Sequence, residues 1–415
     1  MTMRLPTISQ FKNQMHLMST QYDKVAELRV QMATGKKLQS SSDDPVLASQ
    51  IQSIEAYIER LNSYEVNTSF AKSRMTLSTT AMAEGSDLVL QAQDLLVQAQ
   101  NDILADTDRS AIAVQLQGIL DSMMAVANTQ DASGEYIFNG FQAKVQAYIQ
   151  IDDTFQYQGS YNGYSVAISE QTDIQYSESG YAVFGDIKSG NGSFSVASDT
   201  VNNTGTGVLN PVTITGAVVE DDYTLTMVTN GAGDLAYQVV GAVTGQVIPA
   251  PPLAIPTDAP EFVAGGTITF NGITTTLNGS PDLGDTFTIN QSTPQSVFQT
   301  MQNIIDALNT STTTTKSRAD RNQILFEQAS SLTGAFSHIV EQTSILGERA
   351  AILSIQTERN ASAVIDQKIF LQTIADVDLA EVVSDLTLQL TALEMTQQSY
   401  TKIQALFSQL LQQQI

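Results

Sequence analysis

The sequence predicts an α+β fold in which segments from the two ends of the chain pair as an elongated helical rod, with an all-β domain inserted between them. Three observations predict it. Of the 25 glycines, 3 lie in residues 1–133, 20 in residues 134–294 and 2 in residues 295–415. Both ends carry apolar residues at helical spacing, and the middle alternates apolar with polar residues. Because glycine interrupts helices, the ends favour helices and the middle favours strands and turns.

The first predicted helix, residues 7–34, carries a stripe of apolar residues that recur in steps of three and four. A helix cannot bury such a stripe by itself, so it needs a partner surface. We therefore expect the stripe to face the C-terminal helix or a neighbouring subunit. Its members are Ile8, Phe11, Met15, Met18, Tyr22 and Val25.

An elbow follows in the segment TGKKLQSSSDDPVLA, residues 34–48. Gly35 suits the left-handed residue that ends a helix. The pair Asp43 and Asp44 precedes Pro45, and an aspartate before a proline is typical of an N-cap followed by a first helical position. A helix is expected from Pro45 to about residue 82, with further helical segments up to about residue 130. The sequence thus predicts a joint between two helices.

The C-terminal part mirrors the N-terminal part. Thr293 and Pro294 are predicted as the N-cap and first turn of a helix, and a long helix is expected through about Ala375. The last helix, residues 376–412, has a second stripe with steps of four and three, which we expect to pack against the first. Its members are Leu379, Val383, Leu386, Leu390, Leu393 and Tyr400.

The middle of the chain contains alternating segments such as GTITFNGITTTLNG, and its Asn-Gly pairs predict hairpins. The predicted domains are therefore residues 1–42 with 376–415 as terminal coiled-coil helices, residues 43–140 with 294–375 as a helical rod, and residues 141–293 as an inserted β-rich domain. An ordinary closed helical bundle with an inserted β domain stays open as an alternative, because chain ends often lie close together.

Composition excludes several partners. The net charge is −24 and the isoelectric point is about 4.2, which argues against nucleic acid and anionic membranes, since both require clustered lysine and arginine. No apolar run is long enough to span a membrane, so no membrane insertion is expected. The first residues lack the apolar core of a cleaved signal peptide. Cysteine is absent, which removes disulfides and thiolate chemistry.

Little in the sequence suggests catalysis. The segment that starts at His338 resembles the beginning of an H-x-x-E-H zinc motif, but Gln342 stands where the second histidine would be. The acidic pairs at residues 152–153 and 221–222 lie beside predicted strands and are typical of turns. We expect no catalytic residues, no metal and no cofactor, and hence no enzyme.

Three segments resemble those of a known family. They are TGKKLQSSSDDPVLASQI (34–51), SGEYIFNGFQ (133–142) and ADVDLAEVVSDLTLQLTALEMTQQSYTKIQALFSQLL (375–411). All three resemble the bacterial flagellin-like axial proteins. Pro45 after two aspartates is more similar to the hook-associated members at the hook–filament junction than to flagellin. The resemblance covers about residues 1–142 and 294–415 and leaves the middle unmatched.

This resemblance implies a structural adaptor that joins the flagellar hook to the filament outside the cell. Such proteins are exported unfolded by the type III apparatus, without a cleaved signal peptide, and assemble as a ring. The terminal helices would form an inner layer, and the β domain would project outward. The implied partners are further copies of the chain, the other junction protein, flagellin and an export chaperone.

Two alternatives remain at this point. The first is a flagellin subunit of the filament itself. The second, from another class, is a surface adhesin that binds through the β domain, although the acidic middle shows no evident aromatic cluster. An enzyme within the β domain has the least support.

Overall fold

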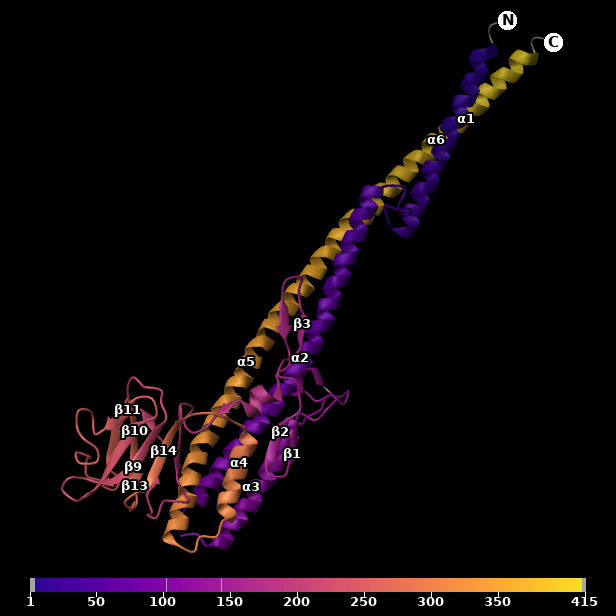
Figure 1. Ribbon diagram of the computed structural model, residues 1–415. Helices are drawn as coiled ribbons and strands as arrows, with labels where there is room; N and C mark the ends of the chain where they lie inside the picture. Colours follow the sequence, from indigo (N-terminus) through magenta and orange to yellow (C-terminus); the bar gives the residue numbers. More distant parts are fainter. Residues whose placement is uncertain (1–3, 102, 143, 413–415) are drawn as a thin grey trace. The chain divides into compact units, whose positions relative to one another are not determined.

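The computed structural model describes residues 4–101, 103–142 and 144–412, without the side chains of residues 4–8, 10, 11, 407 and 410–412. Helices occupy both ends and strands the middle, so the predicted α+β fold with an inserted β region is confirmed (Figure 1). The α-helices are α1 (Arg4–Thr34), α2 (Pro45–Ala99), α3 (Asp106–Ala127), α4 (Val297–Asn309), α5 (Thr315–Ala375) and α6 (Leu379–Gln412).

The strands are β1 (Tyr148–Ile151), β2 (Thr154–Tyr157), β3 (Ser165–Ala167), β4 (Asp173–Gln175), β5 (Ile187–Lys188), β6 (Phe194–Ser198), β7 (Val208–Leu209), β8 (Thr213–Ile214), β9 (Tyr223–Thr229), β10 (Leu235–Gly241), β11 (Gly245–Ile248), β12 (Thr267–Phe270), β13 (Ile273–Asn278), β14 (Thr286–Gln291) and β15 (Pro294–Gln295). A five-stranded sheet has the order β11-β10-β9-β14-β6, and a four-stranded sheet contains β12-β13-β7 with β8 beside β13. Three antiparallel strand pairs, β1-β2, β3-β4 and β15-β5, complete the β structure of the described residues.

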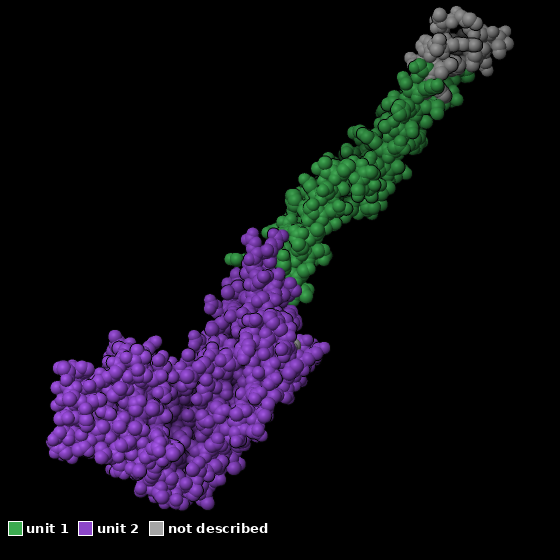
Figure 2. Space-filling view, in the orientation of Figure 1, with its two compact units in different colours: residues 1–66, 356–415 green, residues 67–355 purple. Residues whose placement is uncertain are grey.

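Two compact units make up the chain (Figure 2). The first unit contains residues 1–66 and 356–415, and the second contains residues 67–355. Helices α2 and α5 each run from one unit into the other. Both units therefore combine segments from the two ends of the chain.

In the first unit, α1 and α6 lie side by side along their length (Figure 1). The start of α2 packs against the end of α5 through a small apolar cluster in which Ile58, Leu61 and Val364 are buried. Removing such side chains from water is the main favourable term for pairing two helices that would be marginal alone. The predicted pairing of the two chain ends is confirmed.

The second unit has two cores. The first core joins α2, α3, α4 and α5, and residues 137–187 contribute to it, with Tyr148 packed on Phe298 at 4.6 Å between ring centroids. The second core lies wholly within residues 194–289 and is filled by inward-facing residues of the two larger sheets. The separate β core therefore begins well after the chain leaves the helices.

Two local predictions were wrong. Residues 82–88 do not interrupt the second helix, which continues to Ala99, because Met82 and Val89 are fully buried and their burial outweighs the cost of about 1 kcal/mol for Gly85. Pro294 does not begin a helix but lies in β15, opposite Lys188 of β5. Helix α4 is capped instead by Ser296, whose hydroxyl accepts a hydrogen bond from the Gln299 N–H at 3.1 Å.

Helix α3 is, among the described helices, the one that is long and apolar enough to cross a membrane by composition. Its apolar face, which includes Ile112, Leu116 and Leu120, is buried in the first core of the second unit, where α3 packs against α4. The apolar character of α3 thus has a sufficient explanation in its packing against the rest of the chain.

Substitution of this buried face tests the packing. Leu116→Ala should lower the free energy of unfolding by about 2–5 kcal/mol, because it removes a fully buried side chain and leaves a cavity. Urea denaturation followed by circular dichroism measures the change. Val114, two residues away on the same helix, is 71% exposed, and Val114→Ala should change stability by less than about 0.5 kcal/mol. Equal effects of the two substitutions would contradict the assigned core.

Candidate assembly site in the terminal helices

The seam between α1 and α6 contains part of each predicted stripe. On α1, Val25 is buried and Met18 is half-buried. On α6, Leu393 is buried, whereas Leu386, Leu390 and Tyr400 are half-buried. The Tyr22 hydroxyl accepts a hydrogen bond from the Gln397 side-chain amide at 2.6 Å, which links the two helices at the edge of the seam. The structure thus brings these members of both stripes to one pair of helices.

Other members of the stripes lie on the outside of this pair. Met15 is 51% exposed, Leu379 is 54% exposed, and Tyr22 and Val383 are similarly open. Val382, which was not predicted, is the buried residue of its turn. Val382 and Val383 are adjacent, and the spacing of apolar residues does not indicate which of the two is buried. The sequence therefore contains no signal for Val382. The side chains of Ile8 and Phe11 lie outside the described residues.

The elbow residues lie where the chain turns between α1 and α2. Gly35 has a φ of 70°, the left-handed region that favours glycine. Oδ1 of Asp44 accepts hydrogen bonds from the N–H groups of Val46 and Leu47, both at 3.0 Å, and Pro45 is the first residue of α2. These bonds satisfy two of the N–H groups that the first turn of a helix leaves without intrahelical partners.

Asp43 shapes the loop before the cap. Its Oδ2 accepts a hydrogen bond from the Ser40 N–H at 2.8 Å, and the Asp43 N–H donates to the Ser40 carbonyl at 3.1 Å. The serine-rich segment of the elbow is therefore held in a defined turn.

A second joint, between α5 and α6, lies directly against the elbow. The Lys37 N–H donates to the Ala375 carbonyl at 2.8 Å, and the Val377 N–H donates to the Gly35 carbonyl at 3.0 Å. Lys36 and Asp376 form an antiparallel bridge, and their side chains form an ion pair at 2.6 Å. The break between α1 and α2 and the break between α5 and α6 are thus bonded to each other, which no local pattern in the sequence predicts.

The Lys37 side chain adds a contact with the end of α5. Its ammonium donates to the Thr373 carbonyl at 2.9 Å, and a cation in this position complements the negative end of the helix dipole. On the α6 side, Oδ1 of Asp378 accepts from the Ala380 N–H at 2.8 Å, in the manner of Asp44 on α2. An aspartate next to the start of a new helix therefore occurs at both joints.

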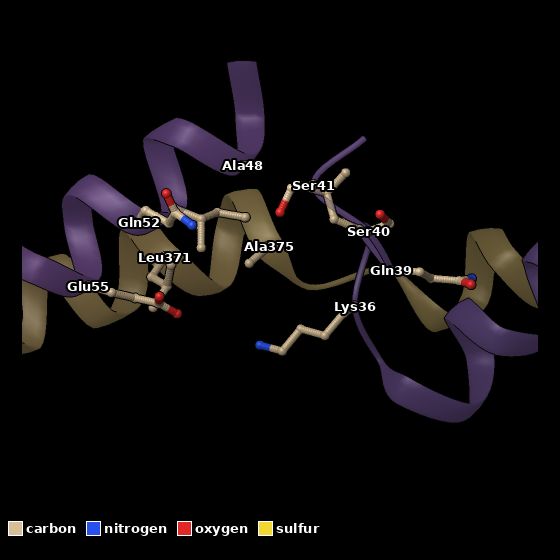
Figure 3. A pocket seen from close by; sticks show the side chains of 11 residues that line it. Lys36, Gln39, Ser40, Ser41, Ala48, Gln52, Glu55, Leu371 and Ala375 are labelled. Carbon is tan, nitrogen blue, oxygen red and sulfur yellow. The ribbon is translucent and has the colours of Figure 1, made fainter. Parts of the chain in front are cut away.

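A cavity of about 280 Å³ opens beside the elbow, within the first unit. Figure 3 shows Lys36 from the elbow, Gln52 and Glu55 from α2, and Leu371 and Ala375 from α5 around it. The lining mixes a cation, a carboxylate, an amide and apolar groups, without a cluster of metal ligands among the described residues.

Two of the residues considered for catalysis, His338 and Asp221, have structural partners. Nε2 of His338 lies 2.7 Å from the Ala182 carbonyl oxygen. Hydrogen bonds from Thr244 hold the pKa of the Asp221 carboxyl below its usual range, and the Val243 N–H adds to this effect. Asp221 thus fastens a turn between β10 and β11, as expected for an acidic residue beside a strand.

Known proteins share this helical architecture. The bacterial flagellin N-terminal helical region matches residues 7–143. Flagellar hook-associated protein 3 of Salmonella typhimurium is 29% identical over 171 residues, which make up 41% of this chain and 52% of that protein. The chain therefore spans about half the length of the curated relatives it matches.

Two solved structures from Legionella pneumophila extend the similarity. Flagellar hook-associated protein 3 is 28% identical with a TM-score of 0.74, over 78% of this chain and 98% of that one. The flagellar junction protein FlgL is 30% identical with a TM-score of 0.68, over 74% of this chain and 99% of that one. The chain belongs to the FlgL family. The predicted resemblance to the hook-associated members of the flagellin-like proteins, which rested on Pro45 and the flanking segments, is thus confirmed.

The cap at the elbow can be tested directly. Asp44→Ala removes the acceptor of two N–H groups and should destabilise the start of α2 by about 1 kcal/mol. Hydrogen exchange of the Val46 and Leu47 amides should accelerate about fivefold, as follows from this free energy. Asp44→Asn keeps a side-chain oxygen at the same place and should exchange close to the unchanged rate. If both variants accelerate exchange equally, the side-chain oxygen does not cap the helix.

Proposed function

We propose that this protein is a non-enzymatic structural adaptor that joins the flagellar hook to the filament. Membership of the FlgL family supports this function, since solved relatives bear the names of a junction protein and of a hook-associated protein. The observation that carries the proposal is the outer surface of the α1–α6 pair. There Met15, Tyr22 and Leu379 are each about half exposed, although α1 and α6 have already paired.

An apolar surface that remains open after the helices pair needs another molecule to cover it. Several further apolar side chains on the same two helices are open, and they are Leu17, Val30, Met32, Val383, Leu388, Met395, Ile403 and Leu406. In a ring, each copy would present this surface to the next one, so that burial is completed only on assembly. The contacts proposed for the predicted stripes are therefore contacts between copies as well as within one copy.

Family membership also supports proposals for the export of the protein, its location and its partners. Export through the type III apparatus, and location at the hook–filament junction outside the cell, complete the proposed role. Its partners would be further copies, the other junction protein, flagellin and an export chaperone. The three-part division with an inner layer of residues 1–42 and 376–415 is part of the same proposal.

Loss of the protein tests the function in cells. Deletion should leave hooks intact while flagellin accumulates as monomer in the medium, because the filament would have no base to attach to. Electron microscopy of cells and immunoblotting of the medium measure both effects. Filaments that remain attached would contradict the adaptor function, and a dominant presence of the protein in sheared filaments would indicate a flagellin instead.

A single substitution tests the seam. Leu390→Asp places a carboxylate at a half-buried position of α6 and should block incorporation into the junction, because a charge is costly to bury. The strands should be unaffected, as judged by far-ultraviolet circular dichroism. Leu390→Met keeps an apolar side chain of similar size and should be incorporated normally. Normal assembly of the aspartate variant would rule out the seam as an assembly contact.

Limited proteolysis tests the dependence of the terminal helices on neighbours. In the monomer, protease should remove roughly the first and last forty residues, because chain ends with exposed apolar faces open locally. Mass spectrometry identifies the remaining fragment, and assembled junctions provide the protected control. Full protection of the monomer would favour a closed bundle.

A further inference from the structure

Helix α5 covers the edges of both larger sheets. Strand β6 is the edge of the five-stranded sheet, and β7 is the edge of the sheet that contains β12 and β13. An edge strand presents N–H and C=O groups that have no partner strand. Opposite these edges, α5 carries three buried polar side chains spaced four residues apart, which places them on one helix face. We call Gln323, Glu327 and Ser331 the edge latch.

Each member of the edge latch bonds to the backbone of the β domain. Gln323 forms two bonds with Leu209 of β7, accepting from its N–H at 2.7 Å and donating to its carbonyl at 2.9 Å. Oε2 of Glu327 accepts from the Val196 N–H of β6 at 3.1 Å. The Ser331 hydroxyl accepts from the Gly190 N–H at 2.8 Å. Gln323 and Glu327 thus bind edge groups that have no partner strand, and Ser331 binds the turn that precedes β6.

Glu327 differs from the other two members because it can ionise. It is only 8% exposed, and its described hydrogen bond comes from a neutral N–H group. Burying a carboxylate is far more costly than burying a carboxylic acid unless an opposite charge lies close. We propose that the edge latch holds the β domain on α5 most firmly when Glu327 is protonated, and that rising pH releases the domain.

Among the described residues, no opposite charge contributes to the pKa of Glu327. The charged residues that precede Glu327 on α5 are Lys316, Arg318, Asp320 and Arg321. Near the ends of β6 and β14 in the sequence lie Lys188, Asp199 and Asp285. Lys316 is paired with Asp320 at 2.6 Å and also donates to the Thr200 carbonyl. Arg321 donates to Asn322 and Thr312. Burial consequently raises the pKa of Glu327 to about 7, and the Val196 N–H only partly opposes the rise.

The direction of the pH effect follows from this raised pKa. The docked domain binds the proton more tightly than the released domain, in which the pKa would return towards 4.5. The stabilisation is fully present below pH 4.5 and is lost as the pH rises to about 7. Between pH 5 and pH 8 the docking equilibrium should weaken by roughly one to two orders of magnitude.

Hydrogen exchange of the full-length monomer between pH 5 and pH 8 tests the proposal, after correction for the intrinsic exchange rate. Protection of the Val196 and Leu209 amides should fall together by the stated factor, because release frees both edges. Amides of α4, in the other core, should keep constant protection and serve as the internal control. Constant protection of Val196 and Leu209, or a fall at Val196 alone, would overturn the proposal.

Two variants separate the titration of Glu327 from that of other acids. Glu327→Gln keeps an oxygen acceptor but cannot ionise, so its protection should be independent of pH over this range. Glu341→Gln changes an exposed acid on the same helix and should keep the pH dependence of the unchanged protein. A pH dependence that persists in Glu327→Gln would assign the effect to another group. If that variant failed to fold, protection of Val196 and Leu209 that does not change with pH in the unchanged protein would still overturn the proposal.

Discussion

The structure depends on burial of apolar helix faces against partners from the opposite end of the chain. In one unit, Ile58 and Leu61 of α2 meet Val364 of α5, and α1 lies along α6. In the other unit, α3 packs against α4. Each helix would be only marginally stable alone, so neither end of the chain folds stably without the other. The middle of the chain must therefore leave the helices and return to them. Strand β5, where the chain enters the separate β region, pairs with β15, where it comes back.

Much of this arrangement could be predicted, because helical spacing and the distribution of glycine act over short stretches of sequence. Helix α2 starts at Pro45, where the Asp44 cap indicated, and α5 ends at Ala375, close to the expected position. Prediction failed where local signals were ambiguous. Pro294 suits both a first helical turn and a strand end, and Val382 cannot be told from Val383 by spacing alone.

Contacts between distant parts of the sequence left no such signal. Gln323 and Glu327 look like ordinary polar residues of a solvated helix face, yet both are buried against strand edges. Tyr157, Tyr161 and Tyr181 form a group of aromatic rings that their separate positions did not indicate. Such features depend on which segments the fold brings together, and one sequence does not encode this in its local periodicity.

The bonded joints have a consequence for the order of folding. Lys36 and Asp376 are separated by 340 residues, and closing a loop of that length costs about 5 kcal/mol of chain entropy. The two backbone bonds and two lysine contacts at the joints contribute about 1 kcal/mol each or less, since they are largely exposed. They cannot close the loop by themselves. Burial between the paired helices must supply the rest, through the α2–α5 cluster and the α1–α6 seam, so the joints form only once the helices around them have begun to pair.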